Sequence, residues 1–255
     1  MTVTDDYMLD RARLAGTGAK VLDLGCGDGR FVEVLSNAGF DAYGVDVPSA
    51  LPGVELRLAD RPDLRSRIVF LDDAEKIPLP DNSVDMILSN NVFEHIPTLS
   101  STVREMARIL KPGGIVYAVF PLRSAIIEGH AHLPFFHRIK SRAWRLRYAN
   151  LMKSIGLYHC PMPPAAIEKY VAVHCFYRSK SEIDAIFSNC FSSVESDARA
   201  YIEIKAKSLK GANGWFRRQL GDVLLRGGAA LLAPIVHTHH SAAYRLSGSV
   251  GRTQS

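Results

Sequence analysis

The stretch that most constrains the fold is AKVLDLGCGDGRF, residues 19–31, in which a short and mainly apolar run ends at three closely spaced glycines. The run, residues 21–24, predicts a buried parallel strand, because such strands are covered on both faces. The residues after the glycines, 30–40, have apolar positions at helical spacing. Glycines at a strand-to-helix turn let the backbone bend tightly and approach a ligand that a Cβ would exclude. The stretch therefore predicts an α/β sheet with a ligand site at the ends of its strands.

The alternation of strand and helix continues to residue 121 and predicts a parallel sheet with helices on both faces. The clearest helix, TLSSTVREMARILKPGG at residues 98–114, stops at its Pro-Gly-Gly. After residue 121 the alternation breaks, and SKSEIDAIFSNC at 179–190 restores a helix. FSSVESDA and AYIEIKAKS, residues 191–198 and 200–208, are expected to form a closing antiparallel pair of strands. The four other strands are predicted in DAYGVDV (41–47), residues 67–71, residues 84–89 and IVYAVFP (115–121).

Composition and charge narrow the class of protein. The 255-residue chain is 47% hydrophobic and 22% charged, which is typical of globular proteins and not of disordered ones. A net charge of +5 favours an anionic partner. The four cysteines include no Cys-x-x-Cys pair, which argues against a disulfide framework or a zinc knuckle and favours a reducing cytoplasm. The first residues contain no apolar signal region and the chain has no run of 18 apolar residues, so neither export nor a membrane span is predicted.

The ligand of the glycine turn is not predicted to be a dinucleotide. The dinucleotide fingerprint requires a third glycine at the position where this chain has Arg30. A pyrophosphate between Asp23 and Asp28 would also be repelled, whereas the ammonium group of an amino acid would not. This charge pattern argues against NAD and favours a ligand with a cationic group.

Four motifs in order resemble the successive motifs of class I S-adenosylmethionine-dependent methyltransferases of the small-molecule "type 11" kind: VLDLGCGDGRF, GVDV, LDDAEKIPLPDNSVDMILSNNVFEHI and REMARILKPGG. The resemblance covers residues 19–121 and, more loosely, residues 179–207. It implies an α/β, Rossmann-like seven-stranded sheet, mostly parallel with an antiparallel last strand, with helices on both faces and an insertion after strand five. It also implies the cofactor S-adenosylmethionine. The predicted segments are an N-terminal helix or cap (1–18), a cofactor-binding core (19–121), an acceptor-binding insertion (122–178), the C-terminal part of the core (179–210) and an apolar and basic tail (211–255).

The resemblance implies that backbone and carboxylate groups at the strand ends hold the cofactor. Asp46, at the end of strand two, would accept hydrogen bonds from both ribose hydroxyls, and Asp23 would hold the methionine amino group through water. Asp73, with the backbone of Ala74, would read the adenine edge, although Asp72 fits that role almost equally well. The implied cofactor-binding residues are Asp23, Gly25, Gly27, Asp46, Asp73, Ala74 and Asn90, the last through its carbonyl group near the methionine.

The acceptor decides which catalytic groups are needed. A sulfonium methyl group needs little activation, so alignment supplies most of the catalysis, roughly 7–11 kcal/mol. A sugar or phenol hydroxyl also needs a general base, most often histidine, whereas a carboxylate or phosphate oxygen needs none. His95 follows strand four in a loop that faces the acceptor in the family, where it is also often structural. Glu128, His130 and His132 follow strand five, at the edge where open sheets bind ligands, and on an extended segment they would point the same way.

The segment EGHAHLPFFHRIK, residues 128–140, has three readings. Two histidines and a carboxylate could hold a divalent ion, but that arrangement requires a strand, and Pro134 interrupts any strand soon afterwards. The strand-end acids that usually bind metal in this superfamily are already assigned to the cofactor, so we predict no metal site. The second reading is a solvated loop. We favour the third, a polar wall of the acceptor pocket with a base among Glu128, His130 and His132 and with His137 as packing or rim; the segment also resembles one found in methyltransferases of glycan and glycolipid biosynthesis.

Two segments bear on partners. Residues 138–153 contain six Lys or Arg and no acid, which predicts a basic amphipathic helix that is either a solvated face or a membrane contact. The tail, residues 215–240, is apolar behind two arginines and is read as either a membrane contact or a packing helix. Nucleic acid is disfavoured, because the chain has no aromatic-interleaved strand platform and no Asn-Pro-Pro-Tyr-type tetrad after strand four.

The sequence therefore predicts a cytoplasmic methyltransferase, with membrane association left open, that methylates a hydroxyl or carboxyl oxygen. A small molecule, sugar or lipid-linked glycan is the favoured acceptor. A quinone-like phenol, an RNA, and a non-catalytic partner that keeps the fold are the alternatives. The complete set of Asp23, the glycines, Asp46 and Asp73 argues against a site without catalysis.

Overall fold

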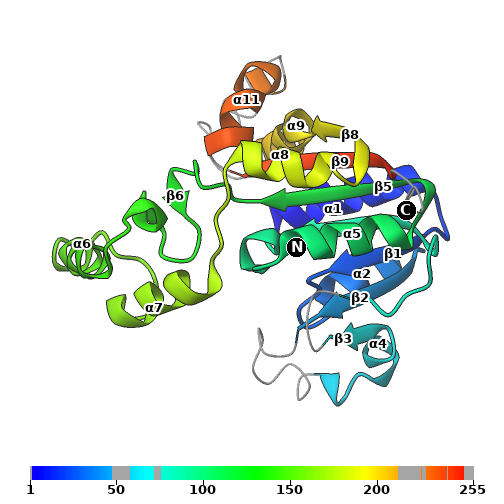
Figure 1. Ribbon diagram of the computed structural model, residues 1–255, viewed down its shortest axis with the longest axis horizontal. Helices are drawn as coiled ribbons and strands as arrows, with labels where there is room; N and C mark the ends of the chain where they lie inside the picture. The colour runs from blue at the N-terminus through cyan, green and yellow to red at the C-terminus, as the bar shows by residue number, and fades with distance from the viewer. Residues whose placement is uncertain are drawn as a thin grey trace.

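The computed structural model describes residues 2–47, 58–71, 76–211, 225, 228–239 and 241–249. Its centre is a seven-stranded sheet in the order β3-β2-β1-β4-β5-β9-β8 (Figure 1). Strands β1 to β5 pair in parallel, and β9 runs antiparallel to both of its neighbours. The predicted fold class is thus confirmed. The strands are β1 (Lys20–Leu24), β2 (Asp41–Asp46), β3 (Ile68–Phe70), β4 (Val84–Asn90), β5 (Leu110–Phe120), β8 (Phe191–Ser196) and β9 (Ala242–Ser249).

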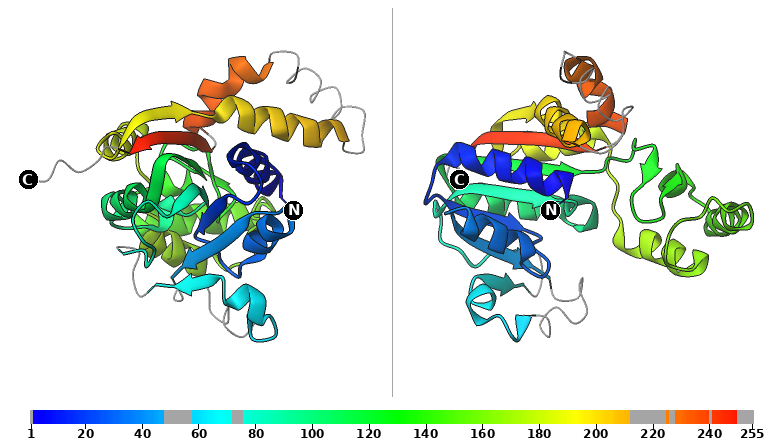
Figure 2. Two further views of the ribbon diagram at one scale, coloured as in Figure 1. Left: turned by 90° about the vertical axis from the view of Figure 1, so that its right-hand side faces the viewer. Right: turned by 180° about the vertical axis from the view of Figure 1, so that it is seen from behind.

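The central strands are apolar because helices cover both faces of the sheet. Side chains of successive residues point to opposite faces, so Val21 and Met86 pack into one layer while Leu22 and Ile87 pack into the other. The first layer contains α1 (Val3–Ala12), α2 (Arg30–Asn37) and α9 (Ala198–Gly211), and the second contains α5 (Leu99–Ile109) and α8 (Lys180–Ser188). In Figure 1 the second layer faces the viewer, and the view from behind in Figure 2 shows α1 and α2.

The closing strand pair differs from the prediction. FSSVESDA contains β8 as expected, but AYIEIKAKS lies within helix α9. The alternation Ile-Glu-Ile-Lys reads as a strand, yet the buried residues Ala198, Ile202 and Ala206 recur every four positions, which is helical spacing. The missing strand is β9, which comes from the predicted tail and inserts between β5 and β8. The tail therefore contributes a strand to the sheet.

Residues 122–178 lie beyond the carboxyl end of β5 (Figure 1). They have an apolar cluster of their own that includes Leu133, Phe136 and Ile167. The predicted basic helix is present as α6, and none of the described helices is both long and apolar enough to cross a membrane. The elements of the insertion are β6 (Ile127–Glu128), β7 (Leu133–Pro134), η4 (Phe136–Arg138), α6 (Arg142–Ser154) and α7 (Pro164–His174). The remaining elements are η1 (Arg13–Ala15), α4 (Pro62–Arg65), η3 (Phe93–His95) and α11 (Ala229–His239).

Candidate active site

The glycine turn lies between β1 and α2 and packs against the loop that follows β4. Gly25 has a φ of +82°, and a Cβ at this position would lie 2.1 Å from Cγ2 of Val92. Its amide donates a 2.8 Å hydrogen bond to the carbonyl oxygen of Val45 at the end of β2. Gly27 also has a positive φ, of +59°. These positions need glycine because the turn is left-handed and because Gly25 approaches a neighbouring loop so closely.

Asp46 closes the turn from the neighbouring strand. Its Oδ2 accepts a 2.6 Å hydrogen bond from the Gly27 amide, and its Oδ1 accepts a 2.7 Å bond from the Val47 amide. Burial raises the pKa of Asp46, and these two backbone bonds offset only part of that effect. A carboxylate offers about four acceptor positions. Both oxygens therefore retain a lone pair for a diol such as a ribose.

Asp23 lies in the same acidic environment. Its side chain is buried, and burial, followed by the charges of Asp46 and Asp5, raises its pKa to about 7. Asp5 is paired with Arg30 at 3.1 Å. Ionising Asp23 beside another carboxylate is unfavourable unless a cation arrives, and an ammonium group would supply that charge. The geometry thus suits the amino group of an amino-acid moiety.

Of the other implied cofactor-binding residues, the structure describes Asn90 but not Asp73 or Ala74. Asn90 ends β4 at the same edge of the sheet, and its Oδ1 accepts a 3.0 Å hydrogen bond from Nδ2 of Asn91. Asp73 and Ala74, with the alternative Asp72, lie outside the described residues. The adenine contact therefore stays a prediction.

Glu128 is the centre of the acceptor side. It is 1% exposed, and its Oε1 accepts hydrogen bonds from Nδ1 of His130 at 2.7 Å and from the hydroxyl of Tyr177 at 2.5 Å. Its Oε2 accepts a bond from the Ala131 amide. Burial alone would raise the pKa of Glu128, but these donors lower it to about 2. Burial lowers the pKa of His130, whereas the bond to Glu128 and the charges of Glu128 and Glu94 outweigh burial and raise it.

His95 meets this pair from the loop after β4. Its Nδ1 lies 2.7 Å from the carbonyl oxygen of His174, and its ring lies 5.1 Å from the ring of His130 in an edge-on arrangement. Burial, together with the charge of His130, lowers the pKa of His95 despite the bond to His174. The charge of His95 also lowers the pKa of Asp46. His95 thus lies beside His130 and influences the pKa of Asp46.

Glu128, His130 and His132 do not share one direction, so the expectation based on an extended segment was wrong. The chain folds back between β6 and β7, and His132 occupies the turn with a φ of +55°. His130 contacts Glu128, whereas the side chain of His132 is exposed. A catalytic role for His132 stays a prediction. His137 is half-buried, donates a 2.9 Å hydrogen bond from Nε2 to the carbonyl oxygen of Arg123, and lies against the ring of Tyr177.

Three side chains of the cluster were not predicted from the sequence. Glu94 precedes His95, and burial raises its pKa to about 8. Cys175 lies 3.8 Å from Nδ1 of His130, and Tyr177 binds Glu128. Cys175 and Tyr177 follow α7 and carry no local motif, so only the folding of the insertion brings them to Glu128. Glu94 could have been found, because it is adjacent to His95 in the sequence.

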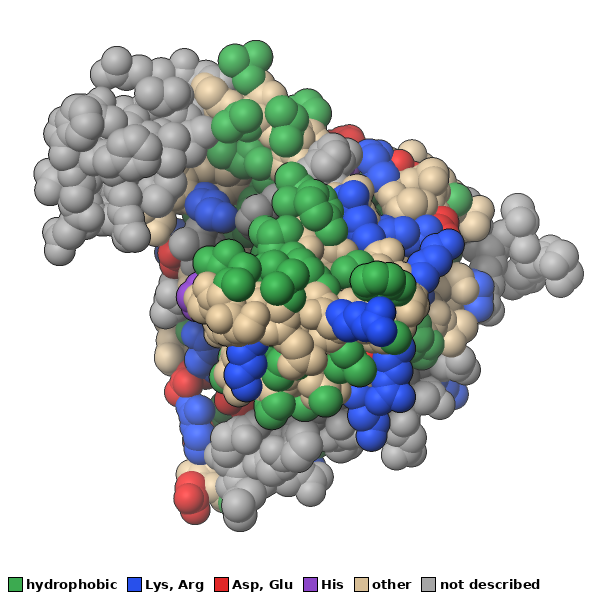
Figure 3. Space-filling model, turned by 90° about the vertical axis from the view of Figure 1, so that its left-hand side faces the viewer, with side chains coloured by type: hydrophobic (Ala, Val, Ile, Leu, Met, Phe, Trp, Pro, Cys, Tyr) green, Lys and Arg blue, Asp and Glu red, His purple; other side chains and the backbone are tan. Residues whose placement is uncertain are grey.

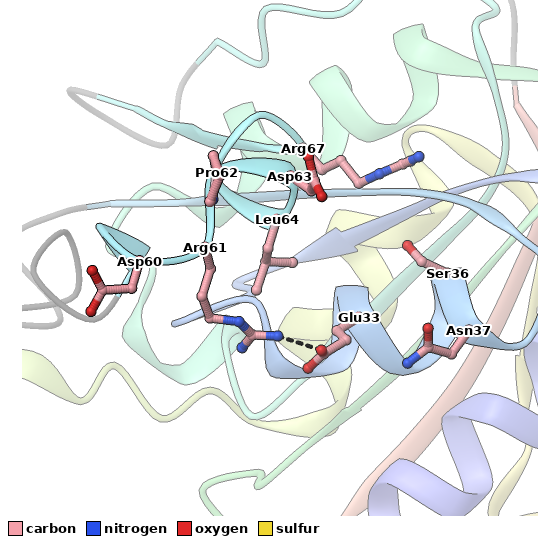
Figure 4. A pocket seen from close by; sticks show the side chains of 9 residues that line it. All are labelled: Glu33, Ser36, Asn37, Asp60, Arg61, Pro62, Asp63, Leu64 and Arg67. Carbon is pink, nitrogen blue, oxygen red and sulfur yellow. Dashed lines mark ion pairs between the residues drawn. The ribbon is translucent and has the colours of Figure 1, made fainter.

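One cavity adjoins this cluster, and another lies between two helices at the β2–β3 side of the sheet. A cavity of about 1100 Å³ is bordered by Cys175, Tyr177 and His137 and by the basic residues Arg138 and Lys140, among others. A smaller cavity of about 400 Å³ lies between the second half of α2 and α4, where Glu33 pairs with Arg61 (Figure 4). The larger cavity adjoins the candidate active site through Cys175 and Tyr177.

Comparison with known proteins agrees with this geometry. Residues 22–118 match a family described as a methyltransferase domain. An uncharacterized methyltransferase from Mycobacterium bovis is 34% identical over 114 residues, which are 44% of this chain and 43% of that protein. A malonyl-[acyl-carrier protein] O-methyltransferase from Methylococcus capsulatus is 31% identical over 144 residues, 53% of this chain and 52% of that protein. The chain thus spans about half the length of the curated relatives it matches.

A solved structure shows the same fold. Phosphoethanolamine N-methyltransferase 2 from Haemonchus contortus, in complex with S-adenosyl-L-methionine, superposes with a TM-score of 0.51 at 19% identity, covering 95% of this chain and 52% of that chain. Residues 22–118 are thus similar to a methyltransferase domain, and the sheet order and the glycine turn with its acidic partners are those expected of a class I S-adenosylmethionine-dependent methyltransferase. S-adenosylmethionine is the cofactor of this class. The acidic site at Asp23 suits its amino group and the carboxylate of Asp46 suits its ribose, while the glycine at position 25 lets the backbone come close to it.

Proposed function

We propose that the protein transfers a methyl group from S-adenosylmethionine to an oxygen of a small-molecule acceptor. The observation that carries this proposal is the contact between Glu128 and His130, with His95 beside them, next to the edge of the sheet where Asp46 ends β2. A hydroxyl of a sugar or of a lipid-linked glycan is the favoured acceptor, and a carboxyl group or a quinone-like phenol is the alternative.

The hydrogen bonds of His95 and His130 determine which ring nitrogen of each is free to take a proton. A carbonyl oxygen and an ionised carboxylate only accept hydrogen bonds, so Nδ1 carries the hydrogen in both His95 and His130. Each Nε2 is then left with its lone pair. Nε2 of His130, oriented and charge-stabilised by Glu128, takes the proton of the acceptor hydroxyl as the oxygen attacks the methyl carbon. A positioned base of this kind contributes roughly 10²–10⁴-fold to the rate.

The cofactor, when bound, supplies an electrophilic methyl group on a sulfonium. The residues of this chain then have three tasks. Asp46 and Asp23 hold the nucleoside and amino-acid ends, the close contact between the Gly25 turn and Val92 fixes the loop after β4, and His95 and His130 receive the acceptor. Alignment of this kind, more than chemical activation, is expected to dominate catalysis.

The relatives leave the acceptor atom open. The Methylococcus relative is named as an O-methyltransferase and the Haemonchus structure as an N-methyltransferase, and the second comparison bears on the fold alone. The carboxylate-supported histidine favours oxygen, because a hydroxyl must lose its proton to become a good nucleophile whereas a neutral amine already carries a lone pair. For the same reason a phenol or sugar hydroxyl is favoured over a carboxylate as the acceptor.

The proposal is tested in two stages. Calorimetric titration with S-adenosylhomocysteine is expected to show binding that Asp46→Ala weakens by about 10²–10⁴-fold. Absence of binding at ligand concentrations up to millimolar would contradict the enzyme proposal. Purified protein is then incubated with radiolabelled S-adenosylmethionine and matched acceptor sets of sugars, phenols, carboxylic acids and amines. Label transferred to hydroxyl compounds and lost in His130→Ala supports the proposal. Transfer only to amines, unaffected by His130→Ala, would contradict it.

We also propose that the insertion, residues 122–178, contacts an anionic membrane surface. Trp144, Arg147 and Leu151 share one side of α6, and Ile155, which caps its C-terminal end, continues that side. The three apolar residues are 61%, 54% and 54% exposed. Residues 129–167 contain no Asp or Glu. Figure 3 shows hydrophobic side chains beside Lys and Arg on the face that carries the insertion. Apolar side chains beside basic ones are typical of interfacial helices.

Not all of the basic residues are available for this contact. Arg142 and Arg145 both bind the buried carboxylate of Glu168, and Arg138 donates to backbone carbonyls of residues 123–125. The exposed cations are Lys140, Arg147 and Lys153, among others. In the tail, the described helix α11 exposes Leu231, Leu232 and Ile235. The electrostatic part of binding is therefore expected to be smaller than the sequence alone predicts.

Vesicle pelleting tests the contact. The protein is expected to sediment with phosphatidylglycerol vesicles at low salt and to be released by high salt, because each basic residue near the surface adds about 1 kcal/mol that salt screens. Trp144→Glu with Leu151→Glu should abolish sedimentation, and Leu231→Glu reports separately on α11. Leu14→Glu, equally exposed but in η1, is the matched control. Deletion of the tail is unsuitable because it would remove β9. Sedimentation unchanged in the double variant would contradict the contact.

A further inference from the structure

We propose that His95, His130 and Cys175 bind one divalent transition-metal ion of the zinc type. One ring nitrogen of each histidine and the sulfur of Cys175 lie within 4.8 Å of one another. Ligand atoms around tetrahedral zinc are separated by roughly 3.3–3.6 Å, so the three groups would have to close by about 1 Å. The three residues come from the loop after β4, the β6–β7 turn and the segment after α7. The sequence prediction of no metal site considered only Glu128, His130 and His132.

The hydrogen bonds behind the two histidines match those of metal ligands. Metal-binding histidines nearly always donate the second ring N–H to a carboxylate or a backbone carbonyl, which fixes the ring and raises its basicity. Here Glu128 holds Nδ1 of His130, and the carbonyl of His174 holds Nδ1 of His95, each at 2.7 Å. Nε2 of each ring is left as a ligand atom. Because the sulfur of Cys175 lies 3.8 Å from Nδ1 of His130, binding through Nε2 requires the His130 ring and Cys175 to rearrange. The ring of Tyr170 lies 5.2 Å from that of His130 and 6.2 Å from that of His95, so an aromatic wall adjoins the two histidines.

An independent observation points to a cation at this place. Glu94 is 3% exposed, and its Oε2 has no hydrogen-bond partner among the described residues. Its Oε1 lies 3.9 Å from Nε2 of His95. A buried carboxylate oxygen without a partner is costly, and a divalent ion beside it would remove that cost. Glu94 thus offers a fourth ligand or a charge partner for the ion.

The ligand types select the ion. Two imidazoles with a thiol suit zinc, and cobalt as its spectroscopic substitute, better than magnesium or calcium, which prefer oxygen ligands. Ion binding would deprotonate the Cys175 thiol. The ion would also use the Nε2 lone pair that the proposed base needs, so the ion and the acceptor proton compete for His130. Binding of the ion itself does not depend on methyl transfer.

Cobalt titration of the metal-free full-length chain tests the site. We expect one equivalent of Co²⁺ to give the visible bands of a tetrahedral site together with a thiolate-to-cobalt charge-transfer band. Zn²⁺ should displace it with a dissociation constant that is roughly micromolar or tighter. Titration of the same sample with S-adenosylhomocysteine reports on the cofactor site separately, so failure of the metal proposal and failure of the proposed function are distinguishable.

The variants assign the ligands. The titrations use a His239→Ala, His240→Ala background, because the His-Thr-His-His run of the tail could bind metal by itself. In that background Cys175→Ser should remove the charge-transfer band and His130→Ala should weaken binding at least about tenfold, whereas Cys160→Ser should change neither. Co²⁺ binding without a charge-transfer band in the parent protein, or a band lost in Cys160→Ser and kept in Cys175→Ser, would overturn the assignment even if one variant folded poorly.

Discussion

The two sides of the candidate site are assembled over different distances along the chain. On the cofactor side, the contact between Gly27 and Asp46 joins residues only 19 positions apart, within one strand–helix–strand unit. On the acceptor side, Tyr177 reaches Glu128 across 49 positions, and His95 meets the carbonyl of His174 across 79. The cofactor side is therefore a local property of the sequence, whereas the acceptor side exists only when the insertion has folded against the sheet.

The sheet and the insertion also pack as separate apolar units. The sheet has apolar layers on both faces, and the insertion has a cluster of its own. The link between them runs through backbone contacts such as the 2.6 Å bond from the Phe176 amide to the Glu94 carbonyl and through Arg178, which donates to the carbonyls of Phe93, Ile96 and Pro97. Disruption of the insertion is thus expected to harm acceptor chemistry while leaving the cofactor side intact. The following predictions test that expectation.

The largest effect is expected for Asp46→Ala. The substitution removes the acceptor of the Gly27 and Val47 amides and the implied partner of two ribose hydroxyls. Two hydrogen bonds to a charged group are together worth about 3–6 kcal/mol, so affinity for S-adenosylhomocysteine should fall by about 10²–10⁴-fold in calorimetry. Asp41→Ala, at the other end of the same strand, is the matched control and should bind as the parent does. Equal losses in both variants would mean that strand integrity, not the ribose contact, was measured.

The acceptor side is tested by His130→Ala. Turnover should fall by roughly 10²–10³-fold because the base is lost, while affinity for S-adenosylhomocysteine stays unchanged. His132→Ala is the control from the same turn, and its exposed side chain predicts a much smaller loss. The comparison requires an acceptor and initial-rate measurements. If His132→Ala proved as damaging as His130→Ala, the turn rather than the Glu128–His130 contact would be the source of catalysis.

The sequence could predict one side of this comparison and not the other. The positions of Asp23, Gly25, Gly27 and Asp46 follow from a motif in which each residue is fixed by its neighbours, and the sheet class follows from repeated strand–helix units. The strand error at AYIEIKAKS arose because alternating residues fit a strand until tertiary packing selects the helical face. Cys175 and Tyr177 carry no local signal, because their role depends on where α7 places the chain that follows it.

A third prediction separates the insertion from the sheet. Glu168 is 1% exposed and binds both Arg142 and Arg145, the second of which is largely buried. Glu168→Ala leaves the Arg145 guanidinium without its carboxylate and should destabilise the insertion by about 2–3 kcal/mol, less than a fully buried pair because Arg142 is exposed. Hydrogen exchange should rise in residues 133–171 and not in β1 or β4. Lys153→Ala, on the same helix, is the control, and uniform exchange throughout the protein would contradict two separate packing units.

The smallest effect concerns pH and is confined to the cofactor side. Asp23 has a pKa raised from 3.8 to about 7 by burial and by the charges of Asp46 and Asp5, so in the ligand-free protein its ionisation costs stability as the pH rises from about 4 to 7. A ligand ammonium favours the ionised form, and binding below pH 7 must therefore expel a proton. Affinity for S-adenosylhomocysteine should fall about tenfold for each pH unit below 7. Calorimetry in buffers of different ionisation enthalpy measures the released proton directly. Asp23→Asn should bind more weakly at pH 8 and lose most of this pH dependence, whereas an unchanged slope in that variant would assign the proton to another group.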